Sequence, residues 1–407
     1  MDEALSALTG QYQPGKTLPQ PFYCNAGVFR EDRKNVLDPL WHLAGHAARI
    51  PHAGDYFVFG ICAEEIIVVR DGNGAIRAHY NVCRHRGSRI CTEASGNAKA
   101  FVCPYHAWTY RLNGTLRGAR LMPGDFRPQD HGLHPCRVRE LHGLIFVSLA
   151  DEPVPFDDAV EPFLHYLRFH GIRTAAVART LVLPTKANWK LVVENFIECY
   201  HCVPAHPEYC SVHSSLKLLA AGAGVGSGPQ DACREYETEF RAWKADVERL
   251  GHPCREGSFD NGSGMARMPI KEGWLTESRD GRPVAPLMGR CTGYDGGITY
   301  VAFNFMNYLI ASNDHAVLFR FTPIGETATD VEAIWLVDGN AVAGRDYDPD
   351  AVSWVWAATL AQDARITEAN QAGIGSSRYR PGPYSEQERM NRKFTRWYID
   401  RLTARSR

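Results

Sequence analysis

Short, alternating apolar stretches fill the first third of the chain. Between Trp41 and Leu149 they are separated by turns rich in Gly, Asn and Asp, and they read YFVFGI, EIIVVRD, AHYNV and LIFVSL. Alternation with a period of two, bounded by turn residues, is typical of strands. The pattern predicts a small all-β domain over residues 41–150, preceded by an irregular arm over residues 1–40 that packs on the second domain.

After residue 160, longer periodic stretches predict helices beside long strands. A helix is expected over 186–202, with its end at Pro204, because proline removes a backbone donor and restrains the residue before it. The other expected elements are a helix over 231–250, a hairpin with an Asp-Gly turn in LTESRDGRPVAPL, two long strands joined by SND between 298 and 325, a strand in DVEAIWLVDG and a helix over 349–371. Residues 160–407 are therefore expected to form an α+β domain with an antiparallel sheet and a long C-terminal helix.

Composition and charge narrow the range of partners. The 407 residues are 44% hydrophobic with a formal net charge of -1, which suits two apolar cores but not a basic surface for nucleic acid or an anionic membrane. The chain starts without an apolar signal region, and its longest apolar runs are about as long as one strand, so no membrane span is expected. Twelve cysteines without a signal peptide indicate thiols and metal ligands, and a cytoplasmic location, rather than a disulfide framework.

Two Cys-His pairs suggest a metal site in the first domain. Cys83, His85, Cys103 and His106 form the pattern C-x-H-x17-C-x-x-H, in which each half places two ligands on one tight loop. These ligands could bind a structural zinc ion or a 2Fe-2S cluster in which one iron takes both Cys and the other both His. Zinc motifs usually pair Cys with Cys and His with His, so the mixed pairs favour the cluster.

A second group of ligand types lies in NWKLVVENFIECYHCVPAH, residues 188–206. Glu198 and His201 are three positions apart and are expected on one helical face, while the break at Pro204 would bring His206 in from a loop. Two His and one carboxylate with open positions form the facial triad of non-haem Fe(II) oxygenases. Each residue could also be structural, and the flanking cysteines, Cys199 and Cys202, are expected to be packing thiols.

The two motifs together resemble Rieske non-haem iron oxygenases. The flanks CRHRG and CPYHAWTY resemble the two cluster loops, and the second stretch resembles the signature of the catalytic subunits. The resemblance implies that Cys83 and Cys103 bind the inner iron of the cluster and that His85 and His106 bind the outer one. It also implies a helix-grip catalytic domain, with the long C-terminal helix across a curved antiparallel sheet, and head-to-tail homotrimers.

The same resemblance implies roles for the second motif. His201 and His206 would bind a mononuclear Fe(II) with Asp363, which lies in AQDARITEANQAGIGSSRYRPGPYS, although Glu208 and Glu368 could compete as the carboxylate ligand. Glu198 would bridge electron delivery between subunits. O2 would be the cosubstrate, and the electrons would come from NAD(P)H through a flavin and iron-sulfur reductase.

Glu198 also points to a subgroup. Ring-hydroxylating members typically have Asp at this position, whereas members acting on betaine, choline or carnitine resemble this chain in having Glu followed by CYHC. This implies hydroxylation or N-demethylation of a small quaternary ammonium compound. Three aromatic residues, Phe303, Phe305 and Tyr308, are candidates for cation-π contacts with it, although strands favour aromatic residues in any case. The alternatives are the alpha subunit of an aromatic-ring dioxygenase, a Rieske electron carrier, and a zinc-stabilised protein that binds small ligands.

Overall fold

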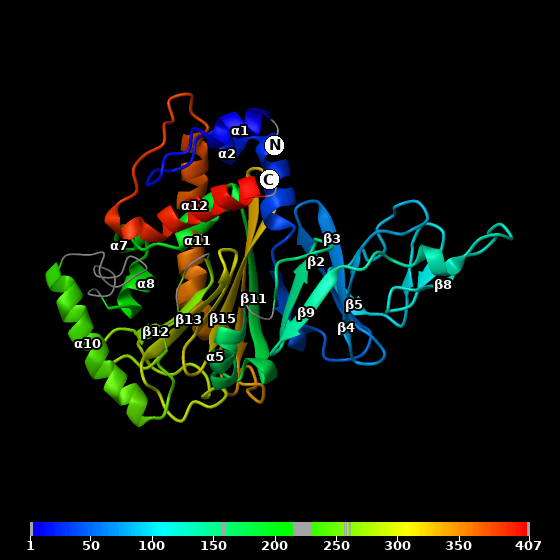
Figure 1. The fold of residues 1–407 in the computed structure, drawn as a ribbon. Coiled ribbons are helices and arrows are strands. Elements are labelled where there is room, and N and C mark those ends of the chain that lie inside the picture. Colours follow the sequence, from blue (N-terminus) through cyan, green and yellow to red (C-terminus); the bar gives the residue numbers. More distant parts are fainter. Residues whose placement is uncertain are drawn as a thin grey trace. The chain divides into compact units, whose positions relative to one another are not determined.

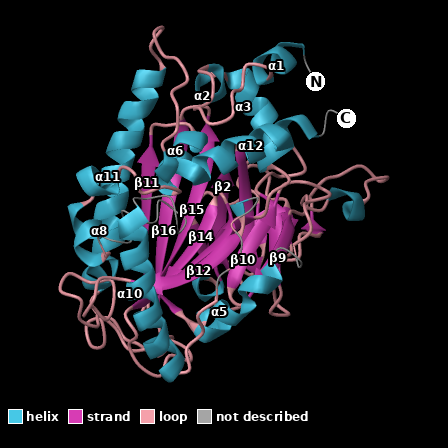
Figure 2. Cartoon of the chain, turned by 60° about the vertical axis from the view of Figure 1, so that its left-hand side comes forward, coloured by secondary structure: helices cyan, strands magenta, loops and turns pink. Residues whose placement is uncertain are grey.

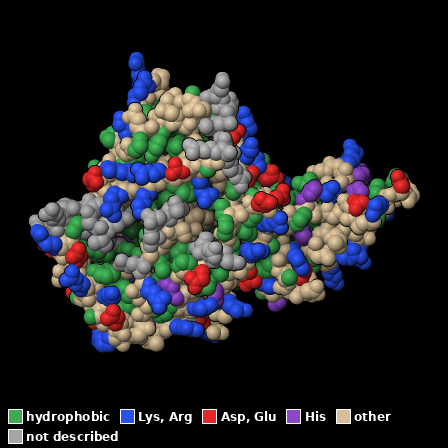
Figure 3. All heavy atoms as spheres, in the orientation of Figure 1, with side chains coloured by type: hydrophobic (Ala, Val, Ile, Leu, Met, Phe, Trp, Pro, Cys, Tyr) green, Lys and Arg blue, Asp and Glu red, His purple; other side chains and the backbone are tan. Residues whose placement is uncertain are grey.

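The chain forms two compact units in the computed structural model, which describes residues 3–156, 160–214, 230–255, 257, 259 and 262–404. One unit is Asp38–Val154, and the other combines Met1–Leu37 with Pro155–Arg407. No helix in the described part of the chain has the length and apolar character needed to cross a membrane. Acidic and basic side chains lie among one another over much of the face drawn in Figure 3.

The unit Asp38–Val154 consists of three small antiparallel sheets (Figure 1). In sheet order, the strands are β1 (His42–His46), β10 (Leu144–Ser148) and β9 (Arg137–Leu141); β4 (Ile76–Tyr80), β3 (Glu64–Arg70), β2 (Asp55–Ile61) and β5 (Ser95–Asn97); and β6 (Phe101–Val102), β7 (Thr109–Tyr110) and β8 (Leu116–Gly118). Short helices lie at Ala47–Arg49 (η2) and Pro128–His131 (η3). The alternating stretches expected to be strands thus form β2, β3, β4 and β10.

The second unit is built on one six-stranded antiparallel sheet. The strand order is β11 (Ala176–Thr185), β16 (Ala328–Val337), β15 (Ala316–Gly325), β14 (Asn307–Ala311), β13 (Gly297–Asn304) and β12 (Gly264–Pro269). The long helix α11 (Pro349–Ile374) packs against β11 and β16, and the short helix α6 (Trp189–Phe196) packs against β15 and β16. Figure 2 shows these helices alongside the sheet. The α+β class and the long helix across an antiparallel sheet are confirmed.

The remaining helices surround this sheet. They are α1 (Glu3–Thr9), α2 (Pro21–Cys24), α3 (Ala26–Asp32), η1 (Arg33–Leu37), η4 (Glu161–Phe163), α5 (Leu164–Phe169), η5 (Ile172–Thr174), α7 (Cys202–Ala205), α8 (Pro207–Val212), α10 (Gln230–Arg249), η7 (Glu386–Glu388) and α12 (Arg389–Ala404). The expected helix over 231–250 matches α10.

The N-terminal segment is helical rather than irregular, because long-range contacts hold it. Asp32 is fully buried, forms an ion pair with Lys190 of α6 and accepts a hydrogen bond from Tyr398 of α12 at 2.6 Å. Tyr23 donates to Glu194 of α6 at 2.8 Å. Such contacts do not follow from local sequence pattern, which explains why the irregular arm was a wrong prediction.

Two strand predictions after residue 270 are also corrected. The expected first long strand divides into β13 and β14, because Asn304 Oδ1 accepts hydrogen bonds from Met306 N and Asn307 Nδ2, each at 2.8 Å, and closes a turn. The stretch LTESRDGRPVAPL forms turns without strands. There, Leu275 N donates to Gly281 O, and Gly281 takes a positive φ of 75°.

Candidate active site

A turn and two short helices follow α6 and carry the residues of the second motif. The helix expected over 186–202 ends early, at Phe196. The prediction that Pro204 ends this helix was wrong. Pro204 is the third residue of α7, a position whose backbone N–H would have no acceptor within the helix, so proline is tolerated there. His206 lies between α7 and α8, and Pro207 begins α8.

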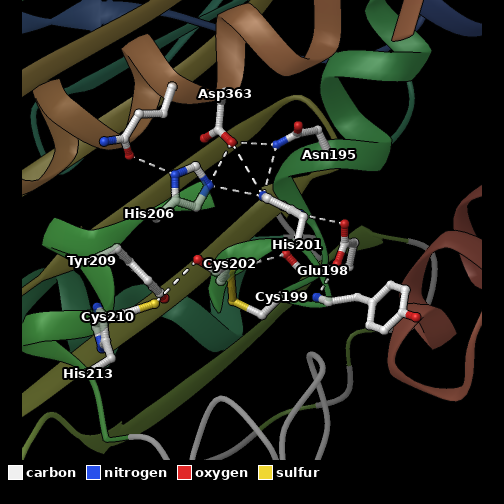
Figure 4. The surroundings of a disulfide bond; sticks show 12 residues. Asn195, Glu198, Cys199, His201, Cys202, His206, Tyr209, Cys210, His213 and Asp363 are labelled. Atoms are coloured by element: carbon white, nitrogen blue, oxygen red, sulfur yellow. Dashed lines mark hydrogen bonds and ion pairs between the residues drawn. A yellow bond between two sulfur atoms is a disulfide. The ribbon is translucent and has the colours of Figure 1, made fainter. Parts of the chain in front are cut away.

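Glu198 and His201 therefore meet across a turn instead of along a helical face. Glu198 accepts hydrogen bonds from the backbone N–H of Tyr200 and from His201 Nδ1, the latter at 2.5 Å. Cys199 and Cys202, expected to be packing thiols, are joined as a disulfide across the same turn (Figure 4). The turn brings their Cα atoms to 4.8 Å, which lies within the range that a disulfide can bridge.

His201, His206 and Asp363 converge at one point, although Asp363 comes from α11 (Figure 4). Asp363 Oδ1 lies 3.0 Å from His206 Nε2 and 3.4 Å from His201 Nε2, and the two Nε2 atoms are 3.1 Å apart. Among the described residues this is the one group of three His, Cys, Asp or Glu whose ligand atoms all lie within 4.8 Å of one another. The donor set is the facial triad expected for non-haem iron.

The outer nitrogen of each histidine is held by a hydrogen bond. His201 Nδ1 donates to Glu198, and His206 Nδ1 donates to Gln362 Oε1 at 2.9 Å. Gln362 in turn donates to Glu208 Oε2 at 2.6 Å. With both Nδ1 atoms donating outward, the Nε2 lone pairs point to the centre, which is the tautomer that a metal needs.

Asn195 is a further member of the site that the sequence analysis did not identify. Its Nδ2 donates to Asp363 Oδ1 at 2.7 Å and lies 3.3 Å from His201 Nε2, while Thr367 donates to its Oδ1. Of the carboxylates considered as competing ligands, Glu208 binds Gln362, and Glu368 accepts from the backbone N–H of Lys186 at 2.9 Å. Neither belongs to the group of converging ligands.

The charges on His201 and Asp363 stabilise one another. Burial opposes a charge on His201, but the carboxylates of Asp363 and Glu198 outweigh it and raise the pKa of His201 to about 9. Burial likewise opposes a charge on Asp363, yet its bonds to His201 and His206 lower the pKa of that carboxyl. The site is therefore built to hold negative charge on Asp363 beside a positive centre.

Beyond the triad, α8 and α11 carry aromatic residues near His206, which precedes α8, and Asp363, which lies on α11. Tyr209 follows His206 by three positions, and Trp356 precedes Asp363 by seven, spacings that return to one helical face. The ring centroids of Tyr209 and Trp356 are 5.4 Å apart, and Tyr209 lies 6.5 Å from the His206 ring. The two helices thus lead from the triad into an aromatic region.

This region contains a buried carboxylate. Trp356 Nε1 donates to Glu277 Oε2 at 3.0 Å, and the Phe319 ring lies 4.9 Å from Trp356. Glu277 is 1% exposed. We call Tyr209, Glu277, Phe319 and Trp356 the Trp356 cluster.

A small pocket lies beside Asp363. Its lining includes Asn195, Phe196 and Leu360. The Phe196 ring also lies 5.2 Å from Phe319 and 6.3 Å from Trp356, so a side chain of the pocket wall packs on the Trp356 cluster.

The three aromatic residues proposed from sequence lie in different surroundings. Tyr308 packs on Phe196, with ring centroids 4.7 Å apart, and so borders the pocket wall. Phe303 packs against Phe163 of η4, and Phe305 packs against two aromatic rings of α12. Trp356, Glu277 and Gln362 were missed because nothing local marks them, although the seven-residue spacing from Trp356 to Asp363 was a usable signal.

In the unit Asp38–Val154, the two Cys-His loops have the same backbone design. The N–H of the fourth residue after each cysteine donates back to that cysteine's carbonyl, from Gly87 to Cys83 and from Ala107 to Cys103. Both of these fourth residues take a left-handed conformation, with φ of 74° at Gly87 and 57° at Ala107. Each loop therefore turns back on its own cysteine.

Their four candidate ligands separate by depth. Cys83 and Cys103 are each 2% exposed, whereas His85 and His106 are exposed, with ring centroids 4.6 Å apart. Burial opposes a charge on Cys103, but the backbone N–H groups of Tyr105 and His106 contribute to a lowered pKa of its thiol. No three of the four ligands are within 4.8 Å of one another in this described region. This spacing suits two irons better than a single zinc ion.

Family models match both units. Residues 40–126 match the Rieske 2Fe-2S domain, and residues 172–404 match the catalytic domain of the ring hydroxylating alpha subunit. The chain is a Rieske non-haem iron oxygenase. Members of this family carry a Rieske cluster and a mononuclear iron and use O2 as cosubstrate, so these are the cofactors of this oxygenase.

Sequence similarity to known proteins covers nearly the whole length of this oxygenase. It is 38% identical to the glycine betaine monooxygenase oxygenase subunit of Chromohalobacter salexigens, over 99% of this chain and 89% of the relative. The corresponding subunit of Pseudomonas aeruginosa is 37% identical over 95% of this chain and 89% of its own length. A solved quaternary ammonium Rieske monooxygenase shares the fold with a TM-score of 0.72, at 19% identity and 97% coverage of both chains.

Proposed function

We propose that this Rieske oxygenase is the oxygenase component of a monooxygenase that hydroxylates or N-demethylates a small quaternary ammonium compound of the betaine, choline or carnitine type. The similarity to glycine betaine monooxygenase oxygenase subunits over nearly the full chain carries this proposal. Oxygenase subunits of carnitine monooxygenases are also similar, at 33% identity over about half of the chain.

The proposal assigns the cluster to the two Cys-His loops. Cys83 and Cys103 would bind the inner iron, and His85 and His106 the outer iron. The buried sulfurs and exposed imidazoles support this assignment, because a Rieske cluster has its two histidines on one iron. Stacking of His85 on Trp108, with interplanar angle 8° and centroids 4.8 Å apart, supports the ring orientation.

The mononuclear iron is assigned to His201, His206 and Asp363. Their converging donors and the outward hydrogen bonds of both Nδ1 atoms support this assignment. When bound, the iron would activate O2 for insertion of one oxygen atom into a C–H bond of the substrate. Two electrons and two protons are needed to reduce the second oxygen atom to water.

Glu198 is proposed to connect electron delivery to this site through its bond to His201. Close to it, Tyr200 and Val203 are 60% and 63% exposed, and Tyr105, next to His106, is 55% exposed. Exposed apolar side chains beside both electron-transfer groups support a contact between subunits, as in the homotrimer that we propose. An electron-transfer partner is required. We propose an NAD(P)H-dependent flavin and iron-sulfur reductase for that role, and a cytoplasmic location.

Oxidation of an N-methyl group defines the test. The hydroxymethyl product is a hemiaminal, which releases formaldehyde and leaves the demethylated amine. We expect anaerobically purified enzyme, supplied with O2, a reductase and NAD(P)H, to release formaldehyde from glycine betaine, choline or carnitine where an N-methyl group is oxidised. Where another carbon is hydroxylated, we expect an alcohol or aldehyde hydrate instead. Formation of a dihydroxylated ring from an aromatic acid, and of none of these products from the amines, would favour the aromatic-ring dioxygenase alternative.

A further inference from the structure

The Trp356 cluster contains a carboxylate whose position is not explained by the iron site. Glu277 is 1% exposed and Trp356 is 4% exposed. Trp356 Nε1 donates to Glu277 Oε2, whereas His213 Nε2 lies 3.0 Å from Glu277 Oε1 without the geometry of a hydrogen bond. Burying a carboxylate with incomplete hydrogen bonding is costly, so it calls for a positive partner.

The basic neighbours of Glu277 among the described residues are two imidazoles, His213 and His315. Of the described Lys, Arg and His side chains, only His213 has a nitrogen within 4.0 Å of Glu277, with Nε2 at 3.0 Å from Oε1. The neighbouring imidazole, His315, donates to Asp314 at 2.8 Å. No lysine or arginine therefore neutralises Glu277 within the described residues.

The surroundings of Glu277 suit a cation that carries no N–H group. Trp356 donates to the carboxylate, and the rings of Tyr209 and Phe319 pack on Trp356, with centroids 5.4 Å and 4.9 Å from its ring. A methylated ammonium group cannot donate a hydrogen bond, and it binds instead to aromatic faces and to a counter-charge. An ordinary ammonium ion could donate one N–H to Glu277 Oε1, but its other N–H groups would face aromatic rings without acceptors.

The distance to the iron ligands also fits a small substrate. Trp356 and Asp363 lie on one face of α11, seven residues apart, which corresponds to about 10 Å of helix. Tyr209 is equally tied to His206 through α8. A trimethylammonium group held here would direct one of its methyl groups towards the triad.

We infer that Glu277 and Trp356 bind the quaternary ammonium head of the substrate and set the specificity of the enzyme for a positive charge. This inference rests on the proposed function, since it presumes a cationic substrate. Glu277 supplies the counter-charge, Trp356 and Tyr209 supply the aromatic faces, and the triad stays free for oxygen chemistry.

The test compares two ligands of the same shape. Glycine betaine and 3,3-dimethylbutanoate differ only in the central atom, which is a positively charged nitrogen in one and a neutral carbon in the other. Their binding to the full iron-loaded enzyme is measured by calorimetry without O2, so that no turnover is needed. We expect the wild type to prefer the cation, and Glu277→Gln to weaken its binding on the order of 100-fold while changing the binding of the neutral ligand less than about threefold.

Two further variants complete the experiment. Trp356→Leu should weaken binding of the cation alone, by roughly 2- to 30-fold. This variant tests the inference independently if Glu277→Gln loses its metals. Glu332→Gln is the matched control, because Glu332 is a buried carboxylate of the same unit that is paired with Arg320. It should leave the preference for the cation unchanged.

The outcomes separate the inference from the proposed function. Equal weakening of both ligands in Glu277→Gln, or no change in either, would overturn the inference and leave the proposed function standing. A folded, iron-loaded wild type that binds neither ligand, or shows no preference for any methylated ammonium compound, would overturn both together.

Discussion

The two candidate iron sites are built in opposite ways. In the Rieske unit, each Cys-His pair sits on a single loop whose fourth residue bonds back to its own cysteine, at Gly87 and at Ala107. In the catalytic unit, the ligands come from two distant segments, and Asn195 and Asp363, which share a hydrogen bond, are 168 residues apart in sequence. The first site depends on loop geometry and the second on the packing of α6, α8 and α11. Substitutions can test how independent the two designs are.

The largest effects are expected from removing one ligand of each site. Cys83→Ser should remove the cluster, about two of three irons per chain together with its sulfides and visible spectrum, and leave mononuclear iron binding intact. Asp363→Ala should do the reverse, because it removes the one carboxylate of the triad. Iron and sulfide analysis with EPR of anaerobically purified protein decides this. Loss of both centres from either substitution would show that the sites are not independent.

A smaller effect is expected where the two sites must communicate. Glu198→Gln keeps an acceptor for His201 Nδ1 but removes the negative charge, so both metal centres should remain while turnover falls roughly 10- to 100-fold. The measurement is steady-state turnover beside single-turnover product formation with a pre-reduced cluster. Wild-type turnover would exclude a bridging role.

Fe(II) binding at the triad should also depend on the residues that hydrogen-bond to its histidines, because these ligands come from distant segments of the chain. Gln362→Leu removes the acceptor of His206 Nδ1 and should weaken Fe(II) binding about tenfold, with the cluster spectrum unchanged. Titration of metal-free protein with Fe(II) measures this. Glu368→Gln on the same helix is the control, since Glu368 binds Lys186 N and no ligand. Equal losses in both variants would mean that α11 is simply destabilised.

The smallest effects concern the backbone of the cluster loops. A Cβ at Gly87 would contact no other atom within 4 Å, so Gly87→Ala should cost only the left-handed conformation, about 1 kcal/mol. Ala107→Gly should stabilise its loop by less than this, because glycine also gains freedom in the unfolded chain. The denaturant midpoint for loss of the cluster spectrum reports both. A stabilising Gly87→Ala would contradict the common design of the loops.

The sequence was informative where structure is local. The strands of the Rieske unit and the Cys-His loops follow from alternation and spacing, and the α+β class follows from the long strands and the helix after residue 349. The resemblance to Rieske oxygenases supplied Asp363, which nothing near it in sequence marks out. The proposed ligand roles remain predictions that the substitutions above address.

Long-range contacts and side-chain turns account for what the sequence did not predict. The N-terminal helices are held by bonds of Asp32 and Tyr23 to residues of α6 and α12, and no local sequence pattern predicts such partners. The helix α6 ends early because the Glu198 side chain accepts a hydrogen bond from the backbone N–H of Tyr200 and closes a turn. The prediction placed the helix end by the position of Pro204 and did not consider this side-chain bond. Glu277 lies in a stretch of turns, where its burial beside Trp356 arises only in the folded chain.

Because Trp356, Gln362 and Asp363 must keep their relative positions on α11, residues 356–363 should tolerate few insertions or deletions. One inserted residue between Trp356 and Gln362 would rotate the two parts of the helix by about 100° relative to each other. An insertion of about seven residues would restore the facing but would move the two side chains about 10 Å further apart. Point substitutions are therefore the tolerated route for changing this stretch. Insertions and deletions in functional relatives should fall outside it.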